Sequence, residues 1–156
     1  MAKKLEEEVE LLRRIPLFAK IEPSRLKLLA FTSERVTYEA GQEICRQGDI
    51  GDAAYLVISG VAEILVDTPT GRIKLAELSK NALVGEIAII NDVPRTATVM
   101  AGTELEALRI TKDHFLRLVA EFPQIAIEIM RVLATRLSRT NEELTDARRR
   151  LAEPVR

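Results

Sequence analysis

The sequence predicts a mainly β protein flanked by helices at both ends, and two patterns carry this prediction. Between residues 33 and 110, short runs of alternating or continuous apolar residues succeed one another, as strands do. Glycines separate the runs, where tight turns need backbone conformations that other residues rarely adopt. Strands this short and evenly spaced are typical of a small barrel, roll or sandwich. The expected strands are 35–38, 43–46, 54–58, 61–66, 72–78, 96–100 and 105–110.

The second pattern is apolar residues at helical spacing near both ends of the chain. This spacing predicts a helix over residues 3–14, and Pro23 opens a second, shorter helix. After the β region, Thr111 can cap a short helix, and Pro123 suits the first turn of a long helix that reaches about Glu153. No repeat or low-complexity linker divides the chain. We therefore expect one domain over residues 1–156, with helices in 1–32, strands in 33–110 and helices in 111–153.

The composition excludes several classes of protein. Of 156 residues, 47% are hydrophobic and 30% charged, as in globular proteins, and the net charge of -1 gives no basic field for a nucleic-acid backbone. No apolar run approaches the roughly 18 residues of a membrane span, and the start lacks the apolar stretch of a secretory signal. Cys45 is the single cysteine, so an internal disulfide is excluded. One cysteine and one histidine are also too few ligands for a zinc site. We expect a cytoplasmic protein without a metal site.

Residues 84–99 combine side chains that suit a sugar phosphate. Gly85 and Glu86 begin a short apolar stretch, 84–91, whose periodicity fits either a strand or one helical turn. Arg95 follows Pro94, which holds the chain extended before it. A helix start offers free N–H groups to an anion, an arginine fork binds phosphate oxygens, and a carboxylate accepts from a ribose hydroxyl. The alternative is a surface arginine after a turn and a glutamate that caps a helical turn.

The segment from Gly85-Glu86 to Pro94-Arg95-Thr96-Ala97 resembles the phosphate-binding cassette of cyclic nucleotide-binding domains. Val84 departs from the pattern, since the family often has an aromatic residue there. The resemblance covers about residues 15 to 145 and implies an eight-stranded β-roll or jelly roll, also called a double-stranded β-helix, with N-terminal helices and a long C-terminal helix. Further segments resemble family signatures in the expected order: Pro16-Leu17-Phe18, Ala40-Gly41-Gln42, Gln47-Gly48-Asp49, Gly51-Asp52 and Tyr55 to Gly60.

The resemblance also implies a role for individual residues. Arg95 would pair with the cyclic phosphate, and Glu86 would accept from the ribose 2′-hydroxyl. Backbone N–H groups of the cassette would complete the anion cradle, with Gly85 permitting close approach. The predicted ligand-binding residues are Gly85, Glu86, Ile87, Ala88, Arg95, Thr96, Ala97, Thr140 and Asn141.

Thr96 bears on the choice of nucleotide. The resemblance implies that a hydroxyl beside the phosphate arginine can reach the amino group of a guanine, which favours cyclic GMP in eukaryotic relatives. Similar prokaryotic domains carry Ser or Thr there and still bind cyclic AMP, and a threonine is also simply a good strand former. We therefore expect cyclic AMP as the ligand, with cyclic GMP as the alternative.

The long C-terminal helix carries a heptad pattern in addition to an apolar face formed by Ile125, Ile129 and Val132. The heptad pattern predicts a coiled-coil seam and hence a homodimer. In the Crp/Fnr branch that this helix resembles, a polar pair near its middle caps the purine, and Thr140-Asn141 occupies the matching place. The seam residues are Ala126, Met130, Leu133, Leu137, Thr140, Leu144, Ala147 and Leu151.

Together these features predict a non-catalytic regulatory sensor domain that couples nucleotide binding to the position or dimerisation of its C-terminal helix. The sequence shows no arrangement of serine, histidine and aspartate and no glycine-rich triphosphate loop. Two alternatives remain open. The chain could be a truncated Crp/Fnr-type transcription regulator, whose DNA-reading domain follows the dimer helix, although no direct DNA binding is expected of the chain itself. It could also be a ligand-free scaffold for protein interactions.

Overall fold

A computed structural model describes residues 2–152 of the chain. It divides into two compact units, which meet in sequence between Leu118 and Val119. The first unit holds the N-terminal helices and all the strands, and the second holds most of the C-terminal helical region.

Two helices and a single 3-10 turn precede the strands. They are α1 (Ala2–Arg13), η1 (Pro16–Phe18) and α2 (Pro23–Thr32), and both η1 and α2 start at a proline, whose fixed φ suits the first turn of a helix. α1 packs on α2. Arg35 secures α1 to the strands, because its guanidinium pairs with Glu8 at 3.1 Å and also with Glu106.

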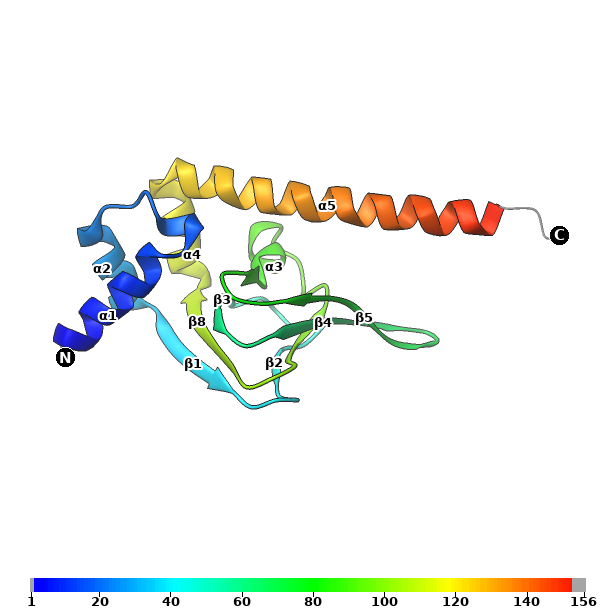
Figure 1. Cartoon of the computed structure of the whole chain (residues 1–156), viewed down its shortest axis with the longest axis horizontal. Coiled ribbons are helices and arrows are strands. Elements are labelled where there is room, and N and C mark those ends of the chain that lie inside the picture. The colour runs from blue at the N-terminus through cyan, green and yellow to red at the C-terminus, as the bar shows by residue number, and fades with distance from the viewer. Residues whose placement is uncertain (1, 153–156) are drawn as a thin grey trace. The chain divides into compact units, whose positions relative to one another are not determined.

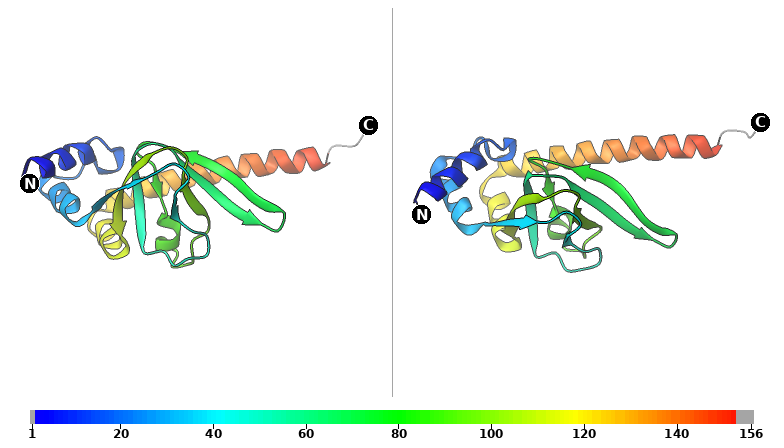
Figure 2. Two further views of the ribbon diagram at one scale, coloured as in Figure 1. Left: turned by 90° about the horizontal axis from the view of Figure 1, so that it is seen from below. Right: turned by 60° about the horizontal axis from the view of Figure 1, so that its bottom comes forward.

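Eight strands form two antiparallel four-stranded sheets, in the orders β1-β8-β3-β6 and β2-β7-β4-β5 (Figure 1). This arrangement confirms the predicted eight-stranded jelly roll with flanking helices. Figure 2 shows the β4–β5 hairpin extending beyond the rest of the roll. The strands are β1 (Glu34–Tyr38), β2 (Glu43–Cys45), β3 (Ala53–Ser59), β4 (Ala62–Thr68), β5 (Gly71–Leu78), β6 (Leu83–Val84), β7 (Thr98–Ala101) and β8 (Leu105–Thr111).

The hydrophobic core of the roll lies between the two sheets. Alternate residues of β3 and β8 face inward from one sheet, and those of β4 and β7 face inward from the other, as the period of two along a strand requires. The cluster comprises Ile44, Ala53, Tyr55, Val57, Ala62, Val84, Val99, Ala101, Leu105 and Ala107. This core holds in place β6, the strand that leads into residues 84–99, and β3, with which β6 pairs.

Two sequence-based expectations about residues 84–99 need refinement. Residues 84–91 were compatible with a strand or a helical turn, and the structure has both, since β6 ends at Val84 and α3 (Glu86–Ile90) begins after Gly85. The strand expected over 96–100 instead begins at Thr98. Residues 96 and 97 stay outside the sheet because the backbone of Arg95 is bonded to the β2–β3 loop, where its N–H donates to the Asp49 carbonyl at 2.8 Å.

Two helices follow the roll, α4 (Lys112–Glu121) and α5 (Pro123–Ala152). α4 begins in the first unit and ends in the second, whereas α5 lies entirely in the second. Both begin where the sequence predicted, and Glu153, the expected last residue of α5, lies outside the described residues. None of the described helices is long and apolar enough to cross a membrane.

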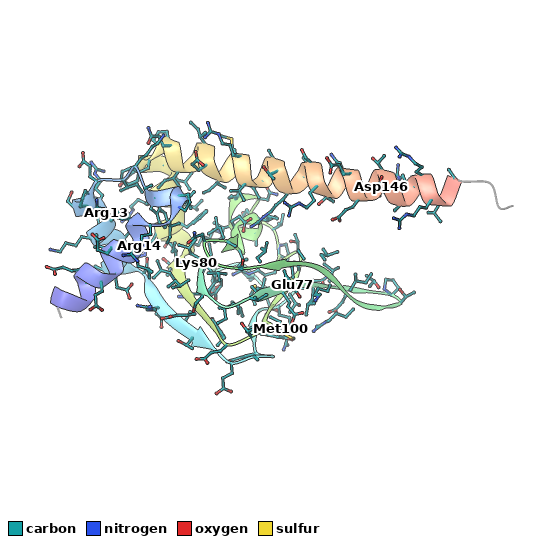
Figure 3. The ribbon with its side chains drawn as sticks, viewed as in Figure 1. Arg13, Arg14, Glu77, Lys80, Met100 and Asp146 are labelled. Atoms are coloured by element: carbon teal, nitrogen blue, oxygen red, sulfur yellow. The ribbon has the colours of Figure 1, made fainter. Side chains whose placement is uncertain are left out.

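Side chains stand on all sides of the C-terminal half of α5, as at the labelled Asp146 in Figure 3. Ile125 and Ile129 are buried, whereas Val132 is exposed. Among the seam residues, Met130, Leu137, Leu144 and Leu151 are all exposed, with Leu137 at 61%. An apolar stripe therefore runs along a helix that is otherwise highly charged.

Candidate functional site

Gly85 turns the chain from β6 into α3. Its φ of 83° lies in the left-handed region, which other residues enter only at a cost. A Cβ at this position would also collide with Nη1 of Arg95. Backbone conformation and close approach therefore both require glycine here.

Arg95 is a buried guanidinium rather than the surface arginine of the alternative interpretation, because it is only 4% exposed. Its Nη1 donates to the Gly85 carbonyl at 2.9 Å, and its Nη2 donates to the Ala53 carbonyl at 2.7 Å. Nη2 also lies 3.5 Å from Oδ1 of Asp52. These bonds take three of the five N–H groups of an arginine and orient its fork. Burying a cation is costly unless anions accompany it.

The loop between β2 and β3 packs directly on the cassette. The Gly48 N–H donates to the Arg95 carbonyl at 2.8 Å, which complements the bond from Arg95 to Asp49. A Cβ at Gly51 would lie 2.7 Å from the Cβ of Ala88, so only glycine lets the loop approach α3 this closely. The glycine-rich segments noticed in the sequence thus serve to bring the loop against the cassette.

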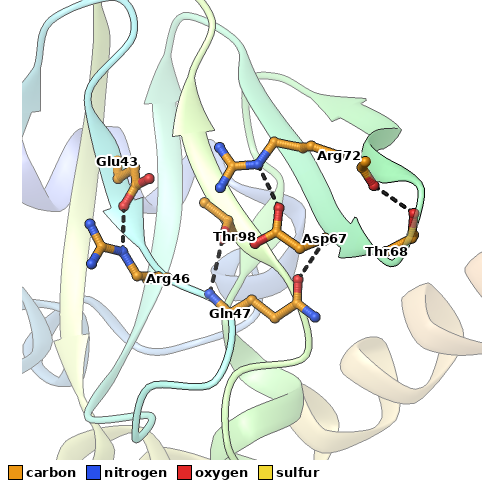
Figure 4. A network of polar contacts seen from close by, with 8 residues as sticks. Glu43, Arg46, Gln47, Asp67, Thr68, Arg72 and Thr98 are labelled. Carbon is orange, nitrogen blue, oxygen red and sulfur yellow. Dashed lines mark hydrogen bonds and ion pairs between the residues drawn. The ribbon is translucent and has the colours of Figure 1, made fainter.

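Gln47 ties this loop to two strands, β7 and β4 (Figure 4). Its backbone N–H donates to the buried Thr98 hydroxyl on β7 at 3.0 Å, and its side-chain oxygen accepts from the Asp67 N–H on β4 at 2.8 Å. Asp67 in turn accepts from Nε of Arg72 on β5, also at 2.8 Å. The position of the loop is therefore coupled to the β4–β5 hairpin.

The structure brings together seven of the nine predicted site residues. Gly85, Glu86, Ile87 and Ala88 lie at the start of α3, and Arg95, Thr96 and Ala97 lie in the segment that leads to β7. Glu86 is 2% exposed, whereas Ile87 and Thr96 are exposed.

The other two residues, Thr140 and Asn141, lie on α5 in the second unit, where both are exposed. The Thr140 hydroxyl donates to the Arg136 carbonyl at 2.9 Å, a local bond within the helix. Their predicted contact with the nucleotide stays a prediction.

Burial and neighbouring groups inside the roll shift the pKa values of several side chains. Burial raises the pKa of the Cys45 thiol, and the charge of Arg95 opposes this rise. Burial, together with the neighbouring Tyr55, raises the pKa of Tyr38 to about 12. Burial also acts to lower the pKa of Arg109, but its interactions with Tyr55 and Asp52 outweigh that effect and raise it. Arg109 is therefore charged at neutral pH.

Sequence reasoning missed two residues of this site as functional candidates. Asp52 contacts the fork of Arg95, and Arg109 on β8 contacts Asp52 through Nη2 at 3.1 Å. The sequence pointed to Asp52 only as part of the Gly51-Asp52 segment that resembles a family signature.

Substitution of Gly85 by alanine is expected to destabilise the protein more than substitution of Gly41. Both glycines have positive φ, at 83° and 88°, so both variants carry a left-handed strain of roughly 1–2 kcal/mol. No atom lies within 4 Å of a Cβ at Gly41, whereas Gly85→Ala must also displace Arg95. We expect the displaced Arg95 side chain to lower the free energy of unfolding of Gly85→Ala by about 1 kcal/mol more than that of Gly41→Ala. Urea denaturation of the two variants measures the difference, and equal losses would show that Arg95 does not depend on this glycine.

Comparison with known proteins assigns the family. The model of the cyclic nucleotide-binding domain family matches residues 35–122, which is more than half of the chain. The chain therefore belongs to the cyclic nucleotide-binding domain family, and the resemblance inferred from the cassette is confirmed.

Three similar proteins illustrate how the domain is used. The CRP-like cAMP-activated global transcriptional regulator of Mycobacterium tuberculosis is 33% identical over 138 residues, which are 88% of this chain and 62% of that protein. The cAMP-dependent protein kinase regulatory subunit of Mucor circinelloides is 34% identical over 69% of this chain and 25% of that protein. The crystal structure of the Thermus thermophilus catabolite activator protein superposes with a TM-score of 0.73 at 31% identity, over 83% of this chain and 62% of that one. The chain thus spans less than two thirds of the length of each, and the two curated relatives are named as regulators.

Proposed function

We propose that this chain is a non-catalytic regulatory domain that binds cyclic AMP at residues 84–99. The observation that carries the proposal is the buried guanidinium of Arg95, which two backbone carbonyls hold in a fixed orientation. Its charge and its two remaining N–H groups, on Nε and Nη1, suit the oxygens of a cyclic phosphate, since a guanidinium binds phosphate through strong charge-assisted bonds.

Other cassette residues would complete the site. The Glu86 carboxylate would accept from the ribose 2′-hydroxyl, and backbone N–H groups of Ile87, Ala88, Thr96 and Ala97 would face the phosphate. Such N–H groups favour an anion because they carry partial positive charge. Thr140 and Asn141 of α5 would cap the purine, which would couple binding to the position of that helix.

Cyclic AMP is proposed over cyclic GMP because the two curated relatives are named as cAMP-activated and cAMP-dependent. Thr96 keeps cyclic GMP as the alternative, since this residue is exposed and its hydroxyl would suit a guanine amino group.

A thermal melt with each nucleotide tests this proposal. Ligand at about 100 times its dissociation constant adds roughly 2.7 kcal/mol to the free energy of unfolding, which for a chain of this size corresponds to about 5–10 °C in melting temperature. We expect this shift with cyclic AMP and a smaller one with cyclic GMP at the same concentration, and 5′-AMP serves as the acyclic control. No shift with either cyclic nucleotide contradicts the proposal. Tighter cyclic GMP binding that Thr96→Ala abolishes would reverse the choice of ligand.

The proposed setting of this function is a cytoplasmic homodimer joined through α5, without direct DNA binding. The apolar stripe on α5 supports the dimer, and the net charge of -1 argues against a nucleic-acid surface on the chain. The protein that acts downstream would be reached through a change in α5. A transcription regulator remains the second candidate, because the mycobacterial relative is one.

A further inference from the structure

Asp52 lies between two arginines that come from distant parts of the roll. Its Oδ1 is 3.5 Å from Nη2 of Arg95, and its Oδ2 is 3.1 Å from Nη2 of Arg109. The first distance is at the limit of a hydrogen bond, whereas the second is a normal ion-pair contact. The carboxylate is therefore engaged mainly by Arg109.

The backbone of Asp52 and the side chain of Arg109 are both anchored. The Asp52 carbonyl accepts from the Lys112 N–H at 2.8 Å, at the end of β8. Arg109 is paired across the sheet with Tyr55 on β3 and with Glu34 on β1. Its interaction with Tyr55 and a 3.8 Å contact to the Glu34 carboxylate fix the guanidinium from two more directions.

The Asp52 carboxylate is also the group best placed to compete with a phosphate. Its side chain is 68% exposed, so it has room to move, whereas the Arg95 side chain is 3% exposed and fixed. If Arg109 were absent, Asp52 would lose its shorter ion pair and could close onto Arg95. The net formal charge at these three positions would then fall from +1 to zero.

We propose that Arg109 is a positioning residue for phosphate binding, which holds the Asp52 carboxylate and so keeps the Arg95 fork available to the nucleotide. This inference rests on the proposed function and adds to it a residue that acts only through Asp52. It explains why a charged side chain occupies an inward position of β8, where the residues two and four positions earlier, Ala107 and Leu105, belong to the apolar core.

A double-mutant cycle read by calorimetric titration with cyclic AMP tests the inference. Arg109→Leu is expected to weaken binding roughly 3- to 30-fold, the range typical of coupled charged neighbours. In an Asp52→Asn background, the same substitution is expected to change the dissociation constant less than about twofold, because no carboxylate is left to close onto Arg95. Arg109→Gln, which keeps a polar group toward Tyr55, is expected to weaken binding as Arg109→Leu does and guards against a variant that fails to fold.

Arg35→Leu is the matched control. Arg35 lies on β1, beside β8, and pairs with Glu8 and Glu106 rather than with Asp52. Arg35→Leu should lower the stability of the protein in urea but leave its dissociation constant for cyclic AMP unchanged. An equal loss of affinity from Arg109→Leu with and without Asp52 overturns the inference, as does full affinity in folded Arg109→Gln. A wild-type chain that gives no heat with cyclic AMP overturns the proposed function itself, and this inference with it.

Discussion

Replacing Arg95 with alanine is expected to weaken cyclic AMP binding by a factor of about 30 to about 4,000. The loss corresponds to roughly 2–5 kcal/mol, the usual effect of removing one partner of a buried, hydrogen-bonded charge pair. The effect is large because Arg95 is oriented before ligand arrives, by bonds of 2.9 and 2.7 Å to the carbonyls of Gly85 and Ala53. The dissociation constant of each variant, measured by calorimetry, gives the loss directly.

Two further variants are controls for the effect of Arg95→Ala on binding. Arg95→Lys keeps the positive charge but lacks the planar fork, so it should lose part of the affinity while retaining the fold. Arg46→Ala removes an exposed arginine that pairs with Glu43 at 2.9 Å, in the same β2–β3 region. Surface pairs of this kind contribute little, and we expect unchanged binding. Normal binding by a folded Arg95→Ala protein would remove Arg95 from the site.

The second large effect is expected at the exposed stripe of α5. Leu137→Glu combined with Leu144→Glu should convert a dimer to monomers, because each substitution places a charge where an apolar side chain would meet a partner helix. Burying a leucine contributes roughly 1.5–3 kcal/mol, so two per chain correspond to at least a hundredfold change in the dimer dissociation constant. Light scattering over a concentration series, with and without cyclic AMP, measures this change.

Ile127→Glu combined with Ala134→Glu is the matched control for the dimer. Both residues are exposed on α5 but lie outside the heptad seam, so their substitution should leave association intact. Ala126, Thr140 and Ala147 at the a positions make the seam only moderately strong, and the dimer should therefore depend on concentration. A wild-type chain that stays monomeric with saturating nucleotide contradicts the prediction and leaves α5 with a role inside one chain.

The strands and helices were largely predictable because their patterns are local. Apolar alternation between glycines located the strands to within about two residues, and Pro123 marked the start of α5 where the structure has it. The stretch 84–91 was ambiguous because a short apolar run has no decisive period. The left-handed φ of Gly85 divides it into the end of a strand and a short helix, and no periodicity records that conformation.

The contacts that build the site were harder to predict because they join residues far apart in the chain. The family resemblance pointed to Arg95, but its partners Ala53 and Asp52 lie 42 and 43 positions earlier. Asp52 and Arg109 are 57 positions apart and meet because the antiparallel register places Arg109 opposite Tyr55. Register depends on the whole sheet, so Arg109 could not be identified as a neighbour of the cassette from its sequence surroundings.

Calorimetric titration of cyclic AMP into the wild-type chain tests the central claim most directly. The claim is that the buried, pre-oriented guanidinium of Arg95 forms part of a nucleotide site within residues 84–99. It predicts saturable heat with one nucleotide bound per chain, and weaker binding by the folded Arg95→Lys protein in the same buffer. Absence of saturable heat from the wild-type chain with both cyclic AMP and cyclic GMP, or equal affinities for wild type and Arg95→Lys, would contradict it.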